Sequence, residues 1–249
     1  MVRLSKSHPR YESLKTRDLL FKSVEYGITH KTGLIAHGRG EAFDYIIGEK
    51  TIDIVNEAES VAAAALLLAK NPVISVNGNV AALNPKDCVS LSNAIPAKLE
   101  INLFHRSNDR VNKIYDVLVR NGASKVYGLI PDANIPFIDH DRSFCDKNGI
   151  FSSDVVLVPL EDGDRCNALK KMGKKVITID LNPLSRTSRD ADITIVDNVV
   201  RAIPNIERWG KKYKDFKKDR LSKKVENWNN EEMLKKILNY ISKRLNSMF

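Results

Sequence analysis

Asp154-Val-Val-Leu-Val158 and Lys175-Val-Ile-Thr-Ile179 are two short, almost uninterrupted apolar runs, and they decide the fold of this chain. β-Branched residues dominate both runs, which is typical of strands buried on both faces of a sheet. Similar runs occur at 73–76, 99–104, 125–130 and 192–196. Polar loops and helical segments lie between most of them. This alternation predicts an α/β fold with a parallel sheet covered by helices on both faces.

Helical periodicity is clearest at 109–121, where Gly122 is expected to cap the carboxyl end. Residues 54–70 are rich in Ala and Leu and predict a buried helix. Residues 10–28 predict a first amphipathic helix, with Arg17 at the border of its apolar face, where a guanidinium needs an anionic partner or water. The residues of that apolar face are Leu14, Phe21, Val24 and Ile28.

The net charge of +9 is concentrated at the carboxyl end of the chain. Of the 40 basic and 31 acidic residues, thirteen and five lie in 208–249, which leaves 27 and 26 in the rest. Apolar residues recur in this segment at three- and four-residue steps, so we predict helices whose lysines are solvated; binding to nucleic-acid phosphates is the alternative. We expect one α/β domain at 1–207, including the first helix, and a basic helical extension at 208–249 packed on it.

Composition and cysteine usage exclude several classes of protein. A hydrophobic fraction of 43% excludes disordered and collagen-like chains. The longest apolar run, 61–69, is far shorter than the ~20 residues of a membrane-spanning helix. The first ten residues lack the apolar core of a signal peptide, and three widely spaced cysteines argue against a disulfide framework and structural zinc. We therefore expect a soluble, cytoplasmic protein.

Polar segments follow four of the predicted strands. Parallel strands present their carboxyl ends at one edge of the sheet, which is where α/β proteins bind ligands. The four segments are Asn77-Gly-Asn79, Pro159–Arg165, Asp180–Thr187 and Asp197-Asn198. Each one alone indicates only a turn, but arginines suit phosphates and carboxylates, while Asp and Asn suit ribose hydroxyls, amines or hydrated Mg²⁺. Together the segments predict a site for a polyanion and a cation.

An acidic cluster and one histidine are candidates for acid–base chemistry. Glu161, Asp162 and Asp164 form either a solvated loop or a site for a protonated amine or Mg²⁺. The histidines show no metal-ligand spacing, so the sequence identifies no metal ligands. His37 is the best candidate for a general acid or base.

The segment Gly33–Tyr45 has two glycines that flank Arg39 and lead into a predicted helix. Glycines at a helix start let backbone N–H groups approach an anion. Phe43 occupies the place of the third glycine of a dinucleotide fingerprint, and the chain contains no P-loop string. Taken alone, the segment is a weak indication of phosphate binding.

Six longer strings carry a resemblance to a known family. They are Ser7-His-Pro-Arg-Tyr11, Gly33–Tyr45, Pro72–Asn79, Leu157–Arg165, Ile179–Thr187 and Thr194–Ala202. In this order they closely resemble the archaeal phosphopantothenate synthetases, or 4-phosphopantoate–β-alanine ligases. The resemblance covers about residues 7–204, and the basic tail contributes little to it.

The resemblance implies a Rossmann-like fold, a homodimer and an enzyme of archaeal coenzyme A synthesis. Such an enzyme joins 4-phosphopantoate to β-alanine with ATP, through an acyl-adenylate, and releases AMP and pyrophosphate; Mg²⁺ is expected with the ATP. The family's ATP contacts match Arg17, Arg39, Asp180, Leu181, Asn182, Arg186, Thr187, Asn198 and Val199. We therefore expect guanidinium groups from the first helix and from the glycine-flanked turn to converge with the late strand ends on one triphosphate.

The remaining candidates are assigned to the other two substrates. Asn77 and Asn79, with the amides of Gly38–Gly40, are expected to hold phosphopantoate, whereas the acidic loop or His37 is expected to hold the amine of β-alanine and accept its proton. Two alternatives stay open: a Rossmann-like nucleotide-dependent oxidoreductase, and a nucleic-acid-binding module that uses residues 208–249.

Overall fold

The computed structural model describes residues 5–248. Residues 1–4 and 249, which are the two ends of the expected domains, lie outside the described part, and residues 1–4 are also the start of the segment considered above for a signal peptide. Six strands form one all-parallel sheet in the order β3-β2-β1-β6-β7-β8. Counted along the sheet, this is the 3-2-1-4-5-6 order of doubly wound Rossmann folds. The strands are β1 (Pro72–Val76), β2 (Lys98–Ile101), β3 (Val126–Tyr127), β6 (Val155–Pro159), β7 (Lys175–Ile179) and β8 (Ile193–Ile195). All six predicted strands are confirmed.

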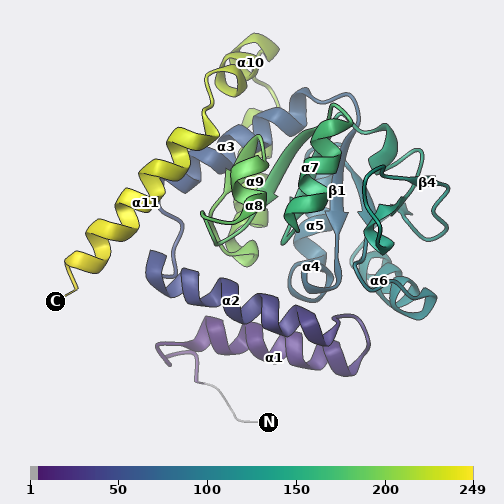
Figure 1. The fold of residues 1–249 in the computed structure, drawn as a ribbon, viewed down its shortest axis with the longest axis horizontal. Coiled ribbons are helices and arrows are strands. Elements are labelled where there is room, and N and C mark those ends of the chain that lie inside the picture. The colour runs from purple at the N-terminus through teal and green to yellow at the C-terminus, as the bar shows by residue number, and fades with distance from the viewer. Residues whose placement is uncertain (1–4, 249) are drawn as a thin grey trace.

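Helices cover both faces of the sheet, as the apolar runs predict (Figure 1). One face packs on α3 (Asp53–Leu68), α5 (Pro85–Ala94), α6 (Asn108–Arg120) and α9 (Val199–Tyr213). The other face packs on α7 (Gly163–Lys171) and α8 (Arg186–Asp190). Strand side chains alternate between the two cores: Ile74 belongs to the first and Val73 to the second. The predicted helices at 54–70 and 109–121 are confirmed, and Gly122 has the positive φ (96°) of a helix-ending glycine.

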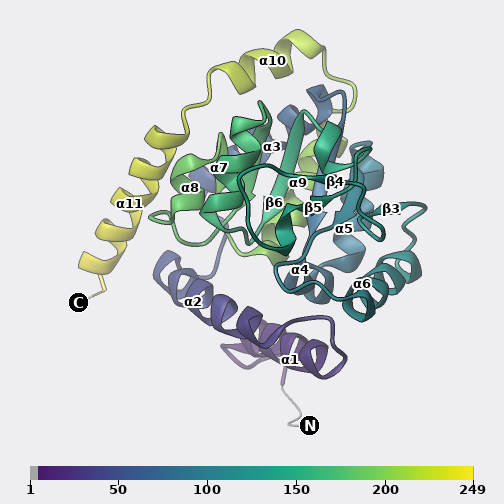
Figure 2. The same ribbon diagram turned by 45° about the vertical axis from the view of Figure 1, so that its right-hand side comes forward.

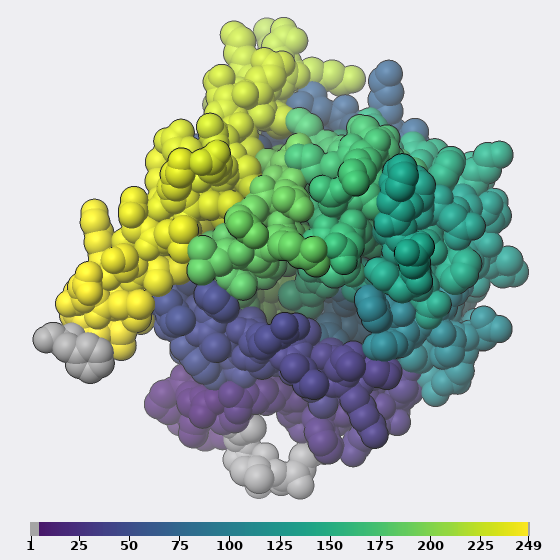
Figure 3. Space-filling view, in the orientation of Figure 1, coloured from purple at the N-terminus to yellow at the C-terminus, as the bar shows by residue number. Residues whose placement is uncertain are grey.

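A pair of amino-terminal helices lies across the carboxyl edge of the sheet (Figure 2). They are α1 (Tyr11–Glu25) and α2 (Lys31–Ile47), and α1 also contacts the short helix α4 (Gly78–Leu83). The expected apolar face of α1 is partly wrong, because Leu20 is the buried leucine whereas Phe21 is 59% exposed. In Figure 3 the two helices form a purple-to-blue band below the body of the protein.

The predicted helix start at Gly38–Gly40 is also wrong. α2 begins seven residues earlier, at Lys31, where the His30 side chain accepts a hydrogen bond from the Thr32 amide and caps the helix. The two glycines therefore lie inside the helix and have no free amides to offer an anion. A Cβ on Gly40 would make ordinary van der Waals contact with Leu181 Cδ1, at 3.5 Å, so this face of α2 lies close to the loop after β7.

A long excursion between β3 and β6 was not predicted. It contains a small hairpin of β4 (Ala133–Asn134) and β5 (Phe144–Cys145), with single 3₁₀ turns at Asp141–Ser143 and Ile150–Ser152. Glu100, which is fully buried on β2, anchors it by accepting the amide hydrogens of Asp146 (2.9 Å) and Ile150 (2.5 Å). Burial raises the pKa of this carboxyl to about 7.

The basic tail packs on the rest of the protein. α10 (Lys218–Glu226) contacts α3, and α11 (Asn230–Asn246) contacts α2, α3 and β8. Leu221, Met233 and Ile237 belong to the same apolar core as the sheet. The domain boundary expected between residues 207 and 208 falls within the continuous helix α9. Across residues 5–248, every helix is too short or too polar to span a membrane.

A buried carboxyl behind the sheet gives the fold a measurable pH dependence. Glu59 on α3 is fully buried, accepts one hydrogen bond from Asn205 Nδ2 (3.0 Å), and burial raises its pKa from 4.5 to about 8. The native protein therefore holds the Glu59 proton more tightly than the unfolded chain does. The stability that the protonated Glu59 contributes is fully present below pH 4.5 and is lost as the pH rises through 8.

We expect Glu59→Gln, which mimics the protonated carboxyl, to be near neutral at pH 5 and to stabilise the protein by about 2 kcal/mol at pH 9. Urea unfolding at both pH values measures the difference. Glu57→Gln, on the exposed side of the same helix, is the control and should show no such pH-dependent gain. Equal effects of the two substitutions at pH 9 would contradict the assignment.

Candidate active site

The carboxyl edge of the sheet and α2 enclose a cavity of about 510 Å³. α2 contributes one wall through Ala36, His37, Arg39, Gly40 and Phe43. The segments after β6, β7 and β8 contribute Glu161, Asp162, Gly163, Asp180, Leu181, Asn182, Ser185, Arg186, Thr187, Asn198 and Val199. Of the nine residues expected to contact ATP, all but Arg17 line this cavity.

The loop after β7 takes its shape from Asp180. The carboxylate accepts hydrogen bonds from the Asn182 amide (2.9 Å) and from Ser185 Oγ (2.5 Å). Ser185 in turn caps α8 by accepting from the Ser188 amide. Burial raises the pKa of Asp180. These hydrogen bonds are made within the loop itself, and Arg186 at the start of α8 lies on the solvent side, where its guanidinium pairs with Asp164 at 3.0 Å.

Asn198 joins the two walls of the cavity. Its side-chain oxygen caps α9 by accepting from the Val200 amide, and its Nδ2 donates to Asp44 on α2 (2.9 Å). Arg201, one turn along α9, bonds the same Asp44 at 2.6 Å and also Asp197 at the end of β8. Because Asp44 and Asp197 are almost fully buried, this network holds α2 against α9 at a fixed distance.

A second cavity, of about 300 Å³, adjoins the first and shares Ala36, Arg39, Asn79, Leu160, Glu161 and Asp162 with it. It is lined by three arginines, Arg39, Arg110 and Arg142, and by His30 and His105; burial lowers the pKa of His30. The rings of His30 and His105 lie 3.9 Å apart. The expected residues Asn77 and Asn79 also line this cavity, but Asn77 caps α4 and donates to Pro159 O, while Asn79 donates to Gly33 O. Their side chains thus join α4 to β6 and to α2.

Within residues 5–248, Arg39 makes no ion pair with another side chain. Its charge acts to lower the pKa of Asp180, but burial has the stronger effect and raises that pKa overall. The guanidinium lines both cavities. An unpaired guanidinium at the junction of two cavities is suited to bind anionic groups from both sides.

Arg17 lies elsewhere. It is bonded by Nε and Nη2 to Glu41 (2.8–3.0 Å) and contacts Tyr45, on the face of α2 opposite to Arg39, Gly40 and Phe43. Hydrogen bonding to Glu41 raises the pKa of Arg17. Within a single chain, the expected convergence of Arg17 with Asp180–Thr187 therefore does not occur.

The acidic cluster is neither the solvated loop nor the free cation site that the sequence suggested. Glu161 is 1% exposed and is bonded to two guanidinium groups, Arg142 Nη1 at 2.6 Å and Arg165 Nη1. Asp162 caps α7 by accepting from the Arg165 amide. Burial acts to raise the pKa of Asp162, but the Arg142 charge and the hydrogen bonds to the carboxylate together outweigh it and lower the pKa. Only Asp164 is exposed. The cluster is a structural ion network, so Glu161 is not free to act as a base.

His37 remains available for proton transfer. Its Nε2 is buried and has no hydrogen-bond partner within the described residues. Burial lowers the pKa of His37 below 6.5, so the imidazole is neutral at pH 7. A neutral ring nitrogen facing a cavity can accept a proton.

A cavity at the carboxyl edge of a doubly wound sheet, lined by an unpaired arginine and by capped helix starts, is typical of nucleotide-binding α/β enzymes. A family model described as phosphopantothenate/pantothenate synthetase matches residues 54–244. The 4-phosphopantoate–β-alanine ligases of Thermococcus onnurineus and Thermococcus kodakarensis are both 52% identical to the chain, covering 100% and 98% of it and 95% and 94% of their own lengths. That of Methanosarcina mazei is 50% identical, covering 100% of the chain and 98% of its own length.

The chain belongs to the phosphopantothenate/pantothenate synthetase family. The expected family and its ligase class are confirmed, in preference to the oxidoreductase and the nucleic-acid-binding module. One expectation is corrected: the similarity extends through the basic tail rather than ending near residue 204. In this chain α11 packs on α2 and β8, so the tail is part of the fold.

No group of three or more metal-ligating side chains occurs in residues 5–248. Three carboxylates line the larger cavity: Glu161, which is paired with two arginines, and Asp162 and Asp180, which accept hydrogen bonds from their own loops. This donor set does not fit a protein-held metal, but it fits a Mg²⁺ that arrives on a nucleotide and keeps most of its ligands there.

Sequence reasoning missed Asp44, Arg110, Arg142 and Arg201. Arg110 donates to the carbonyls of Ile28 and His105, and Arg142 comes from the excursion whose path no local pattern indicates. Asp44 lies in one of the quoted strings, three residues before the helix ends. Only its spacing from His37 could have suggested a role, because the two residues are seven positions apart and therefore lie on the same face of the helix.

We expect Glu161→Gln to destabilise the protein by about 3 kcal/mol, because it leaves the buried Arg165 guanidinium without a carboxylate and Arg142 with only Asp162, at 3.6 Å. Urea unfolding measures the loss. Asp164→Asn, which breaks only an exposed pair, is the matched control and should cost less than about 1 kcal/mol. Unchanged stability of Glu161→Gln with loss of turnover would instead identify Glu161 as a catalytic base.

Proposed function

We propose that the chain condenses 4-phosphopantoate with β-alanine at the expense of ATP, through a phosphopantoyl adenylate, and releases AMP and pyrophosphate. The observation that carries the proposal is the pair of adjoining cavities joined at Arg39. A reaction that links a phosphorylated acid to a nucleotide needs two adjoining anion sites, so that the carboxylate of one substrate can meet the α-phosphorus of the other. Arg39 lies at the junction of the two cavities. The proposal is supported by the relatives, which are named for this reaction.

We assign ATP to the larger cavity. Asp180, Asn182, Asn198 and Val199 supply acceptors and backbone groups suited to the adenosine, and Arg39 and Arg186 supply charge for the phosphates. The smooth wall of α2 supports this assignment, since Ala36 and Gly40 leave room for a flat group. Thr187, at the start of α8, donates to Glu161 O and thereby joins the loops after β6 and β7.

We assign 4-phosphopantoate to the second cavity. Of the arginines that line it, Arg142 compensates Glu161 and Asp162 together with Arg165, whereas Arg39 and Arg110 have no carboxylate partner within residues 5–248. This surplus of positive charge suits a ligand with a phosphate at one end and a carboxylate at the other. The carboxylate would then face Arg39 and the α-phosphorus.

The chemistry proceeds in two displacements. The pantoate carboxylate attacks the α-phosphorus, a P–O bond forms, and pyrophosphate departs; Arg39 stabilises the charge that gathers on the phosphate oxygens. When present on the triphosphate, Mg²⁺ neutralises the departing pyrophosphate. The amine of β-alanine then attacks the acyl carbon, the C–N bond forms, and AMP leaves with the electrons of the C–O bond. His37 Nε2 accepts the amine proton, since it is neutral and unpartnered.

We propose that Arg17 contributes to ATP binding through the expected homodimer. Since Glu41 holds Arg17 on the opposite face of α2, the guanidinium can reach a triphosphate only in a second copy or after α1 moves. Phe21, Tyr26 and Ile35 are more than half exposed on the α1–α2 pair and supply an apolar surface for a partner. As part of this proposal we keep the basic tail, 208–249, as an extension packed on the α/β domain, with the boundary inside α9, and the cytoplasm as the location of the protein.

The reaction is tested by a coupled assay for AMP. With ATP and β-alanine, 4-phosphopantoate should support AMP release, and unphosphorylated pantoate should support at least 10²-fold less, because its neutral hydroxyl leaves the guanidinium groups of the second cavity unpaired. Equal rates with the two acids would refute the assigned phosphate site. Absence of AMP with both would refute the ligase reaction.

Arg39→Ala is expected to lower phosphopantoate-dependent exchange of pyrophosphate into ATP by about 10²–10³-fold, because the charge it stabilises develops in the transition state. Arg189→Ala, on the exposed side of α8, is the matched control and should exchange at the normal rate. A normal rate in Arg39→Ala would remove Arg39 from the reaction.

A further inference from the structure

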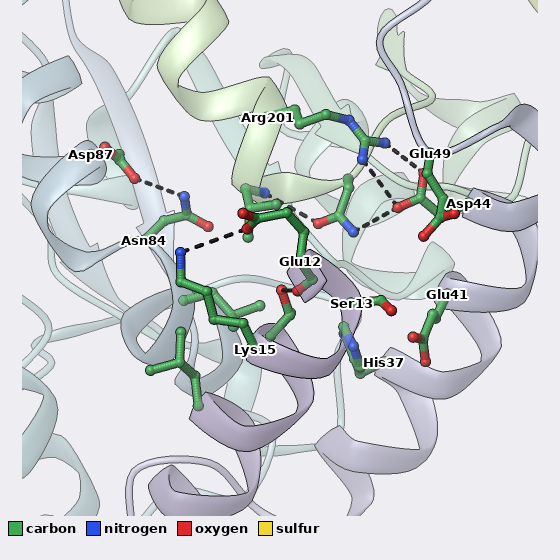
Figure 4. A pocket seen from close by; sticks show the side chains of 15 residues that line it. Glu12, Ser13, Lys15, His37, Glu41, Asp44, Glu49, Asn84, Asp87 and Arg201 are labelled. Carbon is green, nitrogen blue, oxygen red and sulfur yellow. Dashed lines mark hydrogen bonds and ion pairs between the residues drawn. The ribbon is translucent and has the colours of Figure 1, made fainter. Parts of the chain in front are cut away.

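A third cavity, of about 380 Å³, lies beside the larger one and is formed between α1, α2 and the start of α9 (Figure 4). Its other side is the junction of α4 and α5, at Leu83, Asn84 and Asp87. His37 and Asn198 line both this cavity and the larger one, so the two spaces adjoin at these side chains. None of the residues expected to bind ATP lines it except Asn198.

The charge of this acidic cavity is opposite to that of the second cavity. Five carboxylates line it: Glu12, Glu41, Asp44, Glu49 and Asp87. Lys15 and Arg201 are its only cations in the described part of the chain, and both face carboxylates, Lys15 facing Glu12 at 3.6 Å and Arg201 facing Asp44 at 2.6 Å. Glu41 is bonded to Arg17 and Asp44 to Arg201, so the charge left over belongs to Glu49 and Asp87 and, in part, to the exposed Glu12.

The acidic cavity also contains buried acceptors without donors. Asn84 is 2% exposed; its Nδ2 donates to Asp87 (2.9 Å), and its Oδ1 accepts nothing from the described residues. Figure 4 shows this amide oxygen turned away from Asp87 and toward the interior of the cavity. His37 Nε2 is the second such atom. A buried acceptor without a donor costs free energy, which a ligand rich in N–H groups would recover.

We propose that the acidic cavity binds the ammonium group of β-alanine before it attacks the adenylate. A primary ammonium is a compact cation with three N–H donors, which matches surplus carboxylate charge together with the unpartnered Asn84 Oδ1. His37 lies between this group and the larger cavity, where it can take a proton as the amine passes. The proposal rests on the ligase reaction proposed above and adds the site at which the amine binds before it reacts.

Opposite charge keeps the substrates apart. A cavity with surplus carboxylates repels 4-phosphopantoate and the triphosphate, whereas the second cavity with its arginines repels an ammonium ion. The amine is therefore held away from the phosphates until the acyl group is activated. Lys15, half exposed at the edge of the cavity, is the cation nearest to solvent for the carboxylate of β-alanine.

The test separates the two half-reactions in the full-length protein. Pyrophosphate exchange into ATP with 4-phosphopantoate needs no amine, whereas AMP release needs β-alanine. In the double variant Glu12→Gln/Glu49→Gln we expect the KM for β-alanine to rise about tenfold, because two charges close to the ammonium are removed, while the exchange rate and the KM for ATP stay within twofold. Glu25→Gln, at the other end of α1 and outside the cavity, is the matched control and should leave the KM for β-alanine unchanged.

The outcomes are distinct. An unchanged KM for β-alanine in the double variant overturns the proposal. Loss of exchange in the double variant also overturns it, because the carboxylates would then serve the nucleotide or the fold. Lack of exchange in the unmodified protein refutes the proposed ligase reaction instead.

Discussion

The ion network of Asp44, Arg201 and Asp197 is the constraint on which the rest of the site depends. Asp44 comes from α2, Arg201 from α9 and Asp197 from the end of β8, so three elements meet at one guanidinium. Both carboxylates are almost fully buried, and removing a partner from a buried pair leaves an uncompensated charge. The network therefore allows α2 one position across the sheet edge. Since α2 is a wall of all three cavities, their shapes depend on it.

α2 presents a different chemistry on each of its faces. Ala36, Gly40 and Phe43 make one smooth wall, His37 and Asp44 border the acidic cavity, and Glu41 and Tyr45 hold Arg17. Helical geometry separates these faces by about 100° for each residue, so neighbouring positions in sequence serve different spaces. A short stretch of chain thus brings an unpaired guanidinium, a neutral imidazole and a structural carboxylate close together without letting them neutralise one another.

Several charged residues that look catalytic in the sequence are used to build the fold. Glu161 compensates two buried arginines, Asp180 shapes its own loop, and Asn77 caps α4. In the sequence these residues cannot be told apart from free catalytic side chains, because both are polar residues that follow a strand. What distinguishes them is the partner, and the partners of Glu161 come from α7 and from the excursion before β6. The unpaired groups, Arg39 and His37, are the ones left for a ligand.

The sequence by itself determined the six strands, the parallel sheet with helices on both faces, the sheet edge that carries the site, and the family. These follow from apolar runs and long matching strings, which are local properties of the chain. Only the tertiary structure decided that Gly38 and Gly40 lie inside a helix, that Phe21 is exposed, and that Arg17 faces away from Arg39. It also decided which carboxylates are already paired. Those outcomes depend on which distant side chains meet, and an ion pair between residues 24 or 157 positions apart leaves no periodic trace in a single sequence.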